Sequence, residues 1–307
     1  MDSPREKAKS RLKGICLGLT TPFLEDGGFD EEGFRKNIEF YIQNGIKTFV
    51  VGGTMGEVTA LSLDERKHVI RAGVEQSAGR AIILADTHHV GNINEVIGLT
   101  RYAEEVGADF AYILTPFYWR PTDRALFEWY KTIAQSVKKI GIMLYPNPWR
   151  TNVRLKPEVI RELLQFKNIA IVKAADPDVG EITKLVAATR GEIVINIGWE
   201  VHALHAEALG ISNYFGIVGY FNPEFERRYE QAILNMDRQQ LRELHVIQQP
   251  LRELYSEIDA PVLIKECLDM VGLRGGHVRL PLWPMTDDQK RKLREVVKDL
   301  GTKVLDE

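Results

Sequence analysis

The regular alternation of short apolar runs with longer amphipathic segments constrains the fold of this chain more than any other feature of its sequence. Eight runs are apolar at most positions and too short for helices, as parallel strands buried on both faces require. They are Gly14–Thr21, Thr48–Gly52, Ala81–Ala85, Phe110–Leu114, Gly141–Tyr145, Ala170–Ala174, Ile193–Ile197 and Tyr214–Val218.

Seven segments between these runs place apolar residues at three- and four-residue spacing, which predicts amphipathic helices. They are Glu31–Asn44, Leu63–Ser77, Asn94–Val106, Asp123–Val137, Pro157–Phe166, Gly180–Thr189 and Val201–Leu209. An eight-stranded parallel barrel accommodates this order without sheet edges, whereas an open doubly wound sheet exposes two. We therefore expect an α/β protein with a (β/α)8 TIM barrel.

The chain is longer than the barrel needs. It has 307 residues, and a TIM barrel typically occupies ~250. After about Tyr220, the segments Asn222–Glu257, Ala260–Val271 and Thr286–Leu300 are helical in pattern and no further strand follows. We expect residues 1–220 to form the barrel and residues 221–307 a C-terminal helical extension packed on it, with both parts in a single structural unit.

Charge and cysteine content exclude several classes of function. Lys and Arg total 40 against 43 for Asp and Glu, a formal net charge of -3, so no basic excess is present to bind nucleic acid. Two cysteines, Cys16 and Cys267, cannot form a disulfide framework. The charged start lacks the apolar core of a signal peptide, and no run of ~18 apolar residues follows. We expect a cytoplasmic protein without a membrane partner.

Reacting groups of a βα barrel come from the carboxyl ends of its strands and the loops after them. The sixth run contains Lys173 between apolar neighbours. If this amine is desolvated, its pKa falls toward the value that a nucleophilic amine needs. The alternative is a lysine that simply reaches solvent at a strand end.

The fifth run ends at Tyr145, and Arg150 follows five residues later. A phenol beside a lysine can transfer protons, and an arginine can bind a carboxylate through two hydrogen bonds. The alternatives are a tyrosine that only packs and an arginine that only solvates the surface.

Two further features bear on ligand binding. The turn Gly52–Glu57 has no Walker lysine, but its backbone N–H groups and the Thr54 hydroxyl could hold a small carboxylate; a plain tight turn is the alternative. The pairs His88–His89 and His202 with His205 lack a carboxylate that would complete a metal triad. We expect neither a metal nor a cofactor.

These separate features coincide in a family resemblance that extends from Gly14 to about Leu300. The chain resembles the dihydrodipicolinate synthase and N-acetylneuraminate lyase family of class I aldolases. The motifs that carry the resemblance are Gly18–Phe23, Gly53–Glu57, Thr115–Tyr118, Tyr145 with Arg150–Thr151, Val172–Lys173, Gly216–Val218 and Arg279–Leu282.

The resemblance implies a cofactor-free lyase in which Lys173 forms a Schiff base with pyruvate or another 2-oxo acid. It implies that Tyr145 transfers protons and is connected through Thr54 to Tyr118 of a neighbouring subunit in a homotetramer, a dimer of dimers. Five residues have implied roles in substrate binding. Thr54 and Met55 would hold the pyruvate carboxylate, Gly198 and Ile217 would shape the floor of the pocket, and Arg150 would receive a second carboxylate.

Departures from the family pattern bear on the substrate. Met55 stands where the synthases usually have a second hydroxyl, and Tyr145–Pro148 is closer to hydratase-aldolases that act on aromatic pyruvate adducts. Arg150, however, is typical of the synthases. We expect an aldolase that condenses pyruvate with an aldehyde or cleaves a pyruvate adduct; the alternatives are a hydratase-aldolase releasing pyruvate from aromatic 2-oxo acids and a non-catalytic barrel that binds 2-oxo acids.

Overall fold

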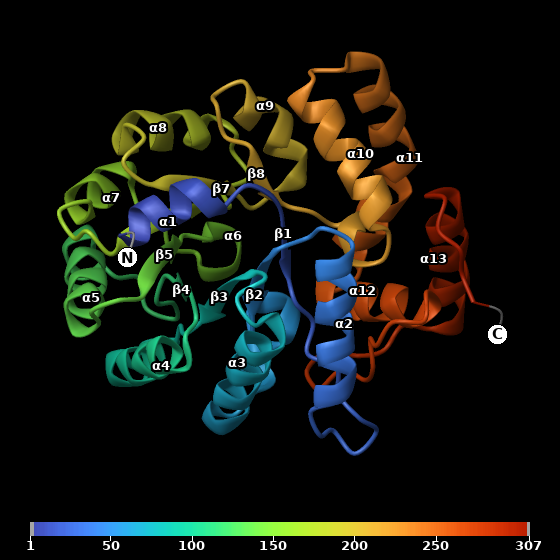
Figure 1. Cartoon of the computed structure of the whole chain (residues 1–307), viewed down its shortest axis with the longest axis horizontal. Coiled ribbons are helices and arrows are strands. Elements are labelled where there is room, and N and C mark those ends of the chain that lie inside the picture. Colours follow the sequence, from blue (N-terminus) through green and yellow to red (C-terminus); the bar gives the residue numbers. More distant parts are fainter. Residues whose placement is uncertain (1–2, 306–307) are drawn as a thin grey trace. The chain divides into compact units, whose positions relative to one another are not determined.

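The computed structural model describes residues 3–305. Eight parallel strands form a closed barrel in which the spatial order follows the chain from β1 to β8, and helices connect the strands (Figure 1). The predicted TIM barrel is confirmed. The chain makes two compact units: unit 1 contains residues 3–14 and 82–215, and unit 2 contains residues 15–81 and the chain from 216 onward.

Unit 1 consists mainly of six consecutive strands and the helices that follow them. Its elements are α1 (Pro4–Arg11), β3 (Ile82–Asp86), α4 (Ile93–Val106), β4 (Phe110–Leu114), α5 (Asp123–Ser136), β5 (Gly141–Tyr145), α6 (Pro148–Thr151), α7 (Pro157–Leu163), β6 (Ile169–Ala174), α8 (Gly180–Thr189), β7 (Val194–Ile197), η3 (Glu200–His202), α9 (Ala203–Glu207) and β8 (Asn213–Phe215).

The strands of unit 1 are buried on both faces, as their apolar sequences predict. Every residue of β3, β4, β5 and β6 is buried. β4 and β5 are in register along their whole length, from Phe110 opposite Gly141 to Leu114 opposite Tyr145. A Cβ atom at Gly141 would collide with the Phe110 ring, so the missing side chain makes room for the aromatic one. The register fixes the positions of the carboxyl ends of β4 and β5 along the barrel axis.

Helix α1 is an element that the apolar pattern did not predict. It begins after Ser3 with a capping box, in which Ser3 and Glu6 bond each other's backbone N–H groups. The helix contacts β5, β6 and β7, and Figure 1 shows it beside β7. Its Arg5 side chain donates to the carbonyl oxygens of Ile169 at 2.9 Å and Leu164 at 2.5 Å. The capping box was the signal in the sequence, but α1 has almost no apolar stripe.

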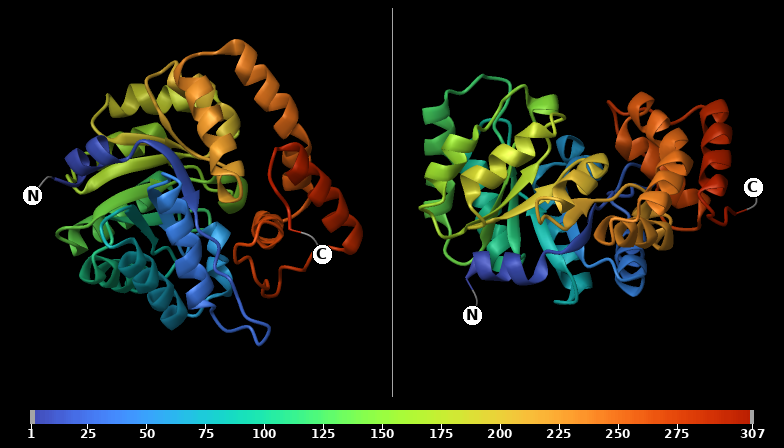
Figure 2. Two further views of the ribbon diagram at one scale, coloured as in Figure 1. Left: turned by 45° about the vertical axis from the view of Figure 1, so that its right-hand side comes forward. Right: turned by 90° about the horizontal axis from the view of Figure 1, so that it is seen from above.

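Unit 2 combines the first two strands with the helices of the C-terminal part. Its elements are β1 (Gly14–Gly18), α2 (Glu31–Gln43), β2 (Thr48–Val51), η1 (Thr54–Gly56), η2 (Val58–Ala60), α3 (Leu63–Ser77), η4 (Val218–Tyr220), α10 (Pro223–Leu234), α11 (Arg238–Glu257), α12 (Ala260–Met270) and α13 (Asp287–Asp299). Figure 2 shows α10 and α11 as neighbouring helices, and α11 also packs on α13.

Several predicted boundaries differ from the observed ones, and two of the differences change how the chain is divided. The helical segment expected over Asn222–Glu257 is divided, because Met236 adopts a left-handed φ of 51° and Asp237 then caps α11. β8 ends at Phe215 rather than Val218, so that Ile217 lies in the turn before η4. The division into a barrel over 1–220 and an extension over 221–307 stays a prediction. Among residues 3–305, none of the helices combines the length and apolar character needed to span a membrane.

Arg5→Ala tests the contribution of α1 to stability. The substitution removes charge-assisted hydrogen bonds to backbone carbonyls, so we expect the free energy of unfolding to fall by about 2–4 kcal/mol. Urea titration followed by circular dichroism measures the loss. Lys9→Ala, at an exposed position of the same helix, is the matched control and should change stability little. Equal losses of stability in Arg5→Ala and Lys9→Ala would contradict a specific contribution of the Arg5 hydrogen bonds.

Candidate active site

Lys173 lies inside the barrel at the carboxyl end of β6. Its side chain is 8% exposed, so the amine does not simply extend into solvent. Its Nζ atom donates a hydrogen bond of 3.1 Å to the hydroxyl of Tyr112 on β4. A side-chain amine held this way has a defined position relative to the barrel interior.

Aromatic rings surround the Lys173 amine. Nζ lies 3.4 Å from the ring centroid of Phe215, 4.6 Å from that of Tyr145 and 5.5 Å from that of Tyr112. Burial penalises the charged ammonium, whereas the electron-rich faces of the rings stabilise it. The rings also cover the amine, which agrees with the low exposure of Lys173.

Tyr145 carries a phenol whose acidity is altered by its surroundings. Its hydroxyl accepts a hydrogen bond of 2.6 Å from Nδ2 of Asn147, and its ring packs 4.6 Å from that of Tyr112. Burial acts to raise the pKa of Tyr145, but the positive charge of Lys173 and the hydrogen bonds from Asn147 and Tyr112 outweigh it, so the pKa lies below its ordinary value. A phenol of this kind is suited to exchange protons with a neighbouring group.

Gly198 allows the Lys173 side chain to reach its position. The backbone N–H of Gly198 donates to the carbonyl of Ala174 at 2.8 Å. A Cβ atom at Gly198 would lie 2.9 Å from Cε of Lys173 and 2.9 Å from Cβ of Ala175. Any larger residue would therefore displace the lysine or its strand.

Arg150 and Tyr118 are exposed groups at the same end of the strands of unit 1. Arg150 lies on the short helix α6, and its positive charge contributes to the lowered pKa of Tyr145. Tyr118 is 80% exposed, adopts a left-handed φ of 79° and packs edge-on against Trp119. A left-handed backbone at a non-glycine residue costs about 1–3 kcal/mol. Tyr118 thus combines backbone strain with an aromatic ring that its own chain leaves uncovered.

Unit 2 contains the remaining three predicted site residues. Thr54 and Met55 open the 3-10 helix η1, where backbone N–H groups have no acceptor within the helix. The side chain of Met55 lies between two groups: a Cβ at Gly18 would be 3.2 Å from its Cγ, and the Tyr255 hydroxyl is 4.0 Å from its sulfur. Ile217 lies in the turn after β8 and is half-buried.

A buried ion pair supports the η1 turn from within unit 2. Glu57 ends η1 with a left-handed φ of 56°, and its carboxylate pairs with the ammonium of Lys265 on α12. The same carboxylate accepts the backbone N–H of Arg279 at 3.0 Å. Burial lowers the pKa of Lys265 to about 8, although the charge of Glu57 opposes this shift. Removing one partner of such a pair costs about 3–5 kcal/mol, so the turn is held firmly.

The sequence analysis did not identify three of the residues that contact Lys173 or Tyr145. These residues are Tyr112, Asn147 and Phe215. Asn147 follows Tyr145 by two positions, and this spacing was an available signal. Tyr112 could be recognised only from the register of β4 with β5, which places it opposite Met143 and two residues before the level of Tyr145.

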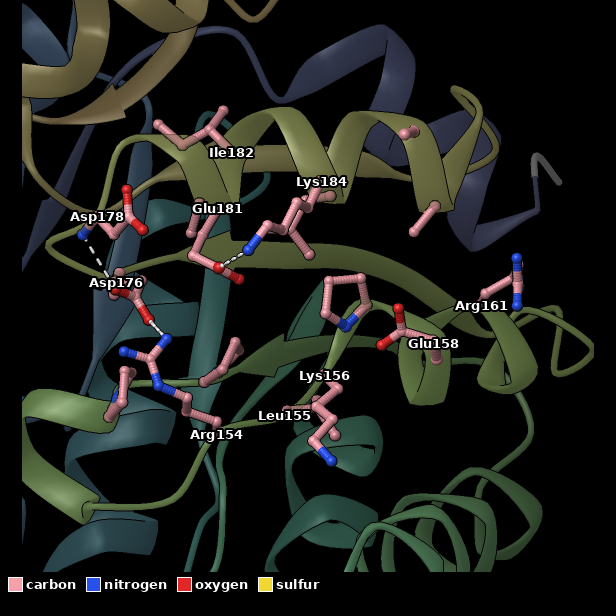
Figure 3. A pocket seen from close by; sticks show the side chains of 18 residues that line it. Arg154, Leu155, Lys156, Glu158, Arg161, Asp176, Asp178, Glu181, Ile182 and Lys184 are labelled. Carbon is pink, nitrogen blue, oxygen red and sulfur yellow. Dashed lines mark hydrogen bonds and ion pairs between the residues drawn. The ribbon is translucent and has the colours of Figure 1, made fainter.

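A cavity of 550 Å³ in unit 1 is separate from this cluster. It lies between α7 and α8, and Ala174, the neighbour of Lys173 on β6, points into it from the opposite face of the strand. Figure 3 shows Arg154 directed at Asp176 and Lys184 at Glu181, two ion pairs that cancel much of the local charge. The cavity thus has no concentration of one charge that would select a ligand.

Side-chain ligands for a metal were also sought. In the described part of the chain, no three His, Cys, Asp or Glu side chains come together as a group that could hold a metal ion.

Gly198→Ala tests the tight contact with Lys173. The added methyl group overpacks the strand end, so we expect a loss of about 1–3 kcal/mol in the free energy of unfolding. The control is Gly98→Ala on α4, where a Cβ atom meets nothing within 4 Å. Because alanine favours the helix, Gly98→Ala should keep or raise stability. If Gly198→Ala leaves the free energy of unfolding unchanged in urea titration, the tight contact between position 198 and Lys173 is wrong.

Comparison with known proteins places this arrangement in a family. A sequence profile described as the Dihydrodipicolinate synthetase family matches residues 11–300. The 4-hydroxy-tetrahydrodipicolinate synthase of Methanothrix thermoacetophila is 34% identical over 288 residues, which cover 93% of this chain and 96% of the relative.

Two solved structures of dihydrodipicolinate synthases resemble this chain in fold as well as in sequence. Dihydrodipicolinate synthase from Aquifex aeolicus has a TM-score of 0.89 at 32% identity and covers 96% of this chain and 100% of its own. The chloride-inhibited synthase from Acinetobacter baumannii, complexed with pyruvate, has a TM-score of 0.88 at 30% identity, with 95% of this chain and 100% of its own covered. The resemblance predicted from the motifs is therefore confirmed, and the chain belongs to the Dihydrodipicolinate synthetase family.

Proposed function

We propose that this chain is a Schiff-base lyase that joins pyruvate to an aldehyde, or cleaves such an adduct, through an imine on Lys173. The observation that carries the proposal is the buried Lys173 amine, 3.1 Å from the Tyr112 hydroxyl and enclosed by aromatic rings. Family membership supports the reaction class, and the pyruvate complex of the Acinetobacter baumannii relative supports the substrate.

The first half of the reaction takes place at the keto carbon of pyruvate. The neutral Lys173 amine adds to this carbon, and the carbinolamine then loses water to give a protonated imine. Protons move to and from the oxygen that leaves, and we assign this transfer to Tyr145. Its lowered pKa and its ring, whose centroid lies 4.6 Å from Nζ, support the assignment. The protonated imine withdraws electrons, so the neighbouring methyl group can lose a proton to a base or to water, and the C–H electrons form the C=C bond of the enamine as the C=N electrons return to nitrogen.

In the second half the enamine carbon attacks the aldehyde, and the new C–C bond forms. Hydrolysis of the imine then releases the product and restores Lys173. Arg150, exposed beside Tyr145, receives a carboxylate of the aldehyde substrate if that substrate carries one. Thr54 and Met55 bind the pyruvate carboxylate through their N–H groups, and Gly198 and Ile217 shape the floor.

The active oligomer in this proposal is a homotetramer built from two dimers, in the cytoplasm. The exposed and strained Tyr118 supports a subunit contact, because an aromatic residue that is 80% exposed in one chain is suited to an interface. Tyr118 then completes the proton path of Tyr145 in the neighbouring subunit.

Borohydride trapping tests the nucleophile. Pyruvate and borohydride added near neutral pH should produce one covalent adduct per chain, and peptide mass analysis should locate it at Lys173. Lys173→Ala should abolish the adduct and keep the fold. Tyr145→Phe should slow turnover by roughly 10²–10⁴-fold, the loss expected when proton transfer is removed.

The same chain provides an internal control, because Lys265 is also buried but is engaged by Glu57. An adduct at Lys265, or no adduct with any of several 2-oxo acids, would favour the non-catalytic alternative. Faster release of pyruvate from aromatic 2-oxo acids than from aliphatic ones would assign the chain to the hydratase-aldolases instead.

Mixing two inactive variants tests the role of Tyr118. If Tyr118 serves the neighbouring site, Lys173→Ala and Tyr118→Ala subunits that are unfolded and refolded together should regain about a quarter of wild-type activity, since half of the dimers are hybrids with one complete site of two. Each variant refolded alone is the control. No recovery on mixing would mean that Tyr118 acts within its own chain or not at all.

A further inference from the structure

The buried ion pair of Glu57 and Lys265 connects α12 to three other segments of unit 2. Glu57 is 4% exposed and Lys265 is 2% exposed. Besides the carboxylate, the ammonium contacts two further groups: it donates to the carbonyl of His277 at 2.6 Å and lies 4.4 Å from the ring centroid of Phe23. One charged group thus connects α12 to η1, to the segment after β1 and to the segment after α12 itself.

The backbone of the η1 turn depends on Glu57. Its φ of 56° and ψ of 42° lie in the left-handed region, which a non-glycine residue keeps only where the surrounding contacts hold it there. The turn also packs closely against the segment after β1, since a Cβ atom at Gly56 would lie 3.0 Å from the hydroxyl oxygen of Thr21 and 3.2 Å from the carbonyl oxygen of Leu19. The turn is therefore held from two sides.

The turn directs two backbone N–H groups that it does not use itself. Three other N–H groups in it donate to carbonyls of the same turn, at 2.9–3.3 Å. Among residues 3–305, the N–H groups of Thr54 and Met55 have no acceptor. The proposed function assigns the pyruvate carboxylate to these two groups. Because a peptide N–H is fixed to its backbone, its direction changes whenever the turn changes shape.

Stability alone does not account for a buried ion pair at this place. Burying two charges costs about as much as their attraction returns, and an apolar pair of similar volume is often equally stable. A charge-assisted hydrogen bond adds direction to the contact. Both carboxylate oxygens of Glu57 have such a partner, because Oε1 meets the ammonium of Lys265 and Oε2 accepts the backbone N–H of Arg279 at 3.0 Å. The pair is suited to select one conformation of the turn.

A second cation holds the segment that follows the turn. The guanidinium of Arg279 donates to the carbonyl of Ala60, at the end of η2, at 2.9 Å and to that of Gly27 at 2.6 Å. It also lies over the Phe23 ring, 4.1 Å from the centroid. These contacts do not involve Lys265. Loss of the Lys265 charge should therefore release η1 and leave η2 in place.

We infer that Lys265, acting through Glu57, is a positioning residue for the binding of the substrate carboxylate at the η1 turn. Its ammonium fixes the carboxylate of Glu57, this carboxylate fixes the left-handed backbone, and the backbone directs the N–H groups of Thr54 and Met55. The pair determines how tightly a 2-oxo acid binds and takes no part in the imine chemistry. This inference rests on the proposed function.

Exchange of the pyruvate methyl protons in D2O, followed by NMR near neutral pH, separates binding from chemistry. Lys265→Met removes the charge and keeps an unbranched side chain. Weaker hydrogen bonds to the carboxylate should raise KM for pyruvate about 10–100-fold. The value of kcat should stay within about threefold, because an interaction made equally in the bound state and the transition state changes KM alone.

Pyruvamide provides a second measurement, because it has the same keto carbon and methyl group but no charge. In Lys265→Met its kcat/KM for proton exchange should change by less than about threefold, so the preference of the wild type for pyruvate should be largely lost. A purely structural role of Lys265 would lower the exchange of both ketones together.

A double variant excludes the effect of an unpaired buried charge. Lys265→Met leaves the Glu57 carboxylate buried without its partner, which destabilises the fold. Glu57→Gln/Lys265→Met removes both charges, and the amide oxygen can still accept the N–H of Arg279. It should show the same rise in KM for pyruvate. The matched control is Glu266→Gln/Lys290→Met, which removes an ion pair of 2.9 Å from the adjacent position of α12 and should keep the wild-type KM.

Each outcome decides between the claims. Unchanged KM for pyruvate in a folded variant would overturn the inference, as would equal losses with pyruvate and pyruvamide or a wild type that does not prefer pyruvate. If circular dichroism shows that neither variant folds, the pair serves the fold alone and the inference is wrong. A wild-type protein that exchanges no pyruvate protons would refute the proposed function itself.

Discussion

The burial of the Lys173 amine is the constraint around which unit 1 is organised. An amine enters so apolar an interior only if other groups offset the loss of water. Here the Tyr112 hydroxyl accepts its hydrogen bond, and the face of Phe215 lies 3.4 Å from it. The neighbouring phenol of Tyr145 responds to the same charge, since Lys173 lowers its pKa. The reactivity of the cluster and its packing thus have one common cause.

The barrel and the candidate lysine inside it could be predicted because both depend on local patterns. Eight apolar runs indicate strands directly, and Lys173 stands out as the one charge inside such a run. Tyr112 and Phe215 did not stand out, because aromatic residues in strands are common and only the register of the closed barrel turns these two toward Nζ. Helix α1 was missed because its stability comes from caps and from Arg5 rather than from an apolar stripe.

Contacts between residues far apart in the sequence account for other features that could not be predicted. Glu57 and Lys265 are 208 positions apart in the sequence. Their sequence neighbours do not mark them as buried, and they meet only because α12 and η1 are in contact in the fold. The glycine-rich turn was predicted, but its support was not. Asp86 and His88 lie only two positions apart, and Nδ1 of His88 is 2.6 Å from Oδ1 of Asp86, yet the sequence analysis considered His88 only as a metal ligand together with His89. The structure separates the two histidines by their partners, because Nδ1 of His88 meets Asp86 whereas Nδ1 of His89 accepts the N–H of Asn92.

Gly198 has a consequence for the entropy of the reaction. A lysine side chain ordinarily loses close to 2 kcal/mol of rotamer freedom when it is held in one conformation. Because the methylene carbons of Lys173 are confined between the backbone at Gly198 and the aromatic rings, that freedom is already lost when the chain folds. The cost is then part of folding stability and is not added to the activation barrier. In the proposed reaction, a bound 2-oxo acid therefore meets an amine that is already held in one conformation.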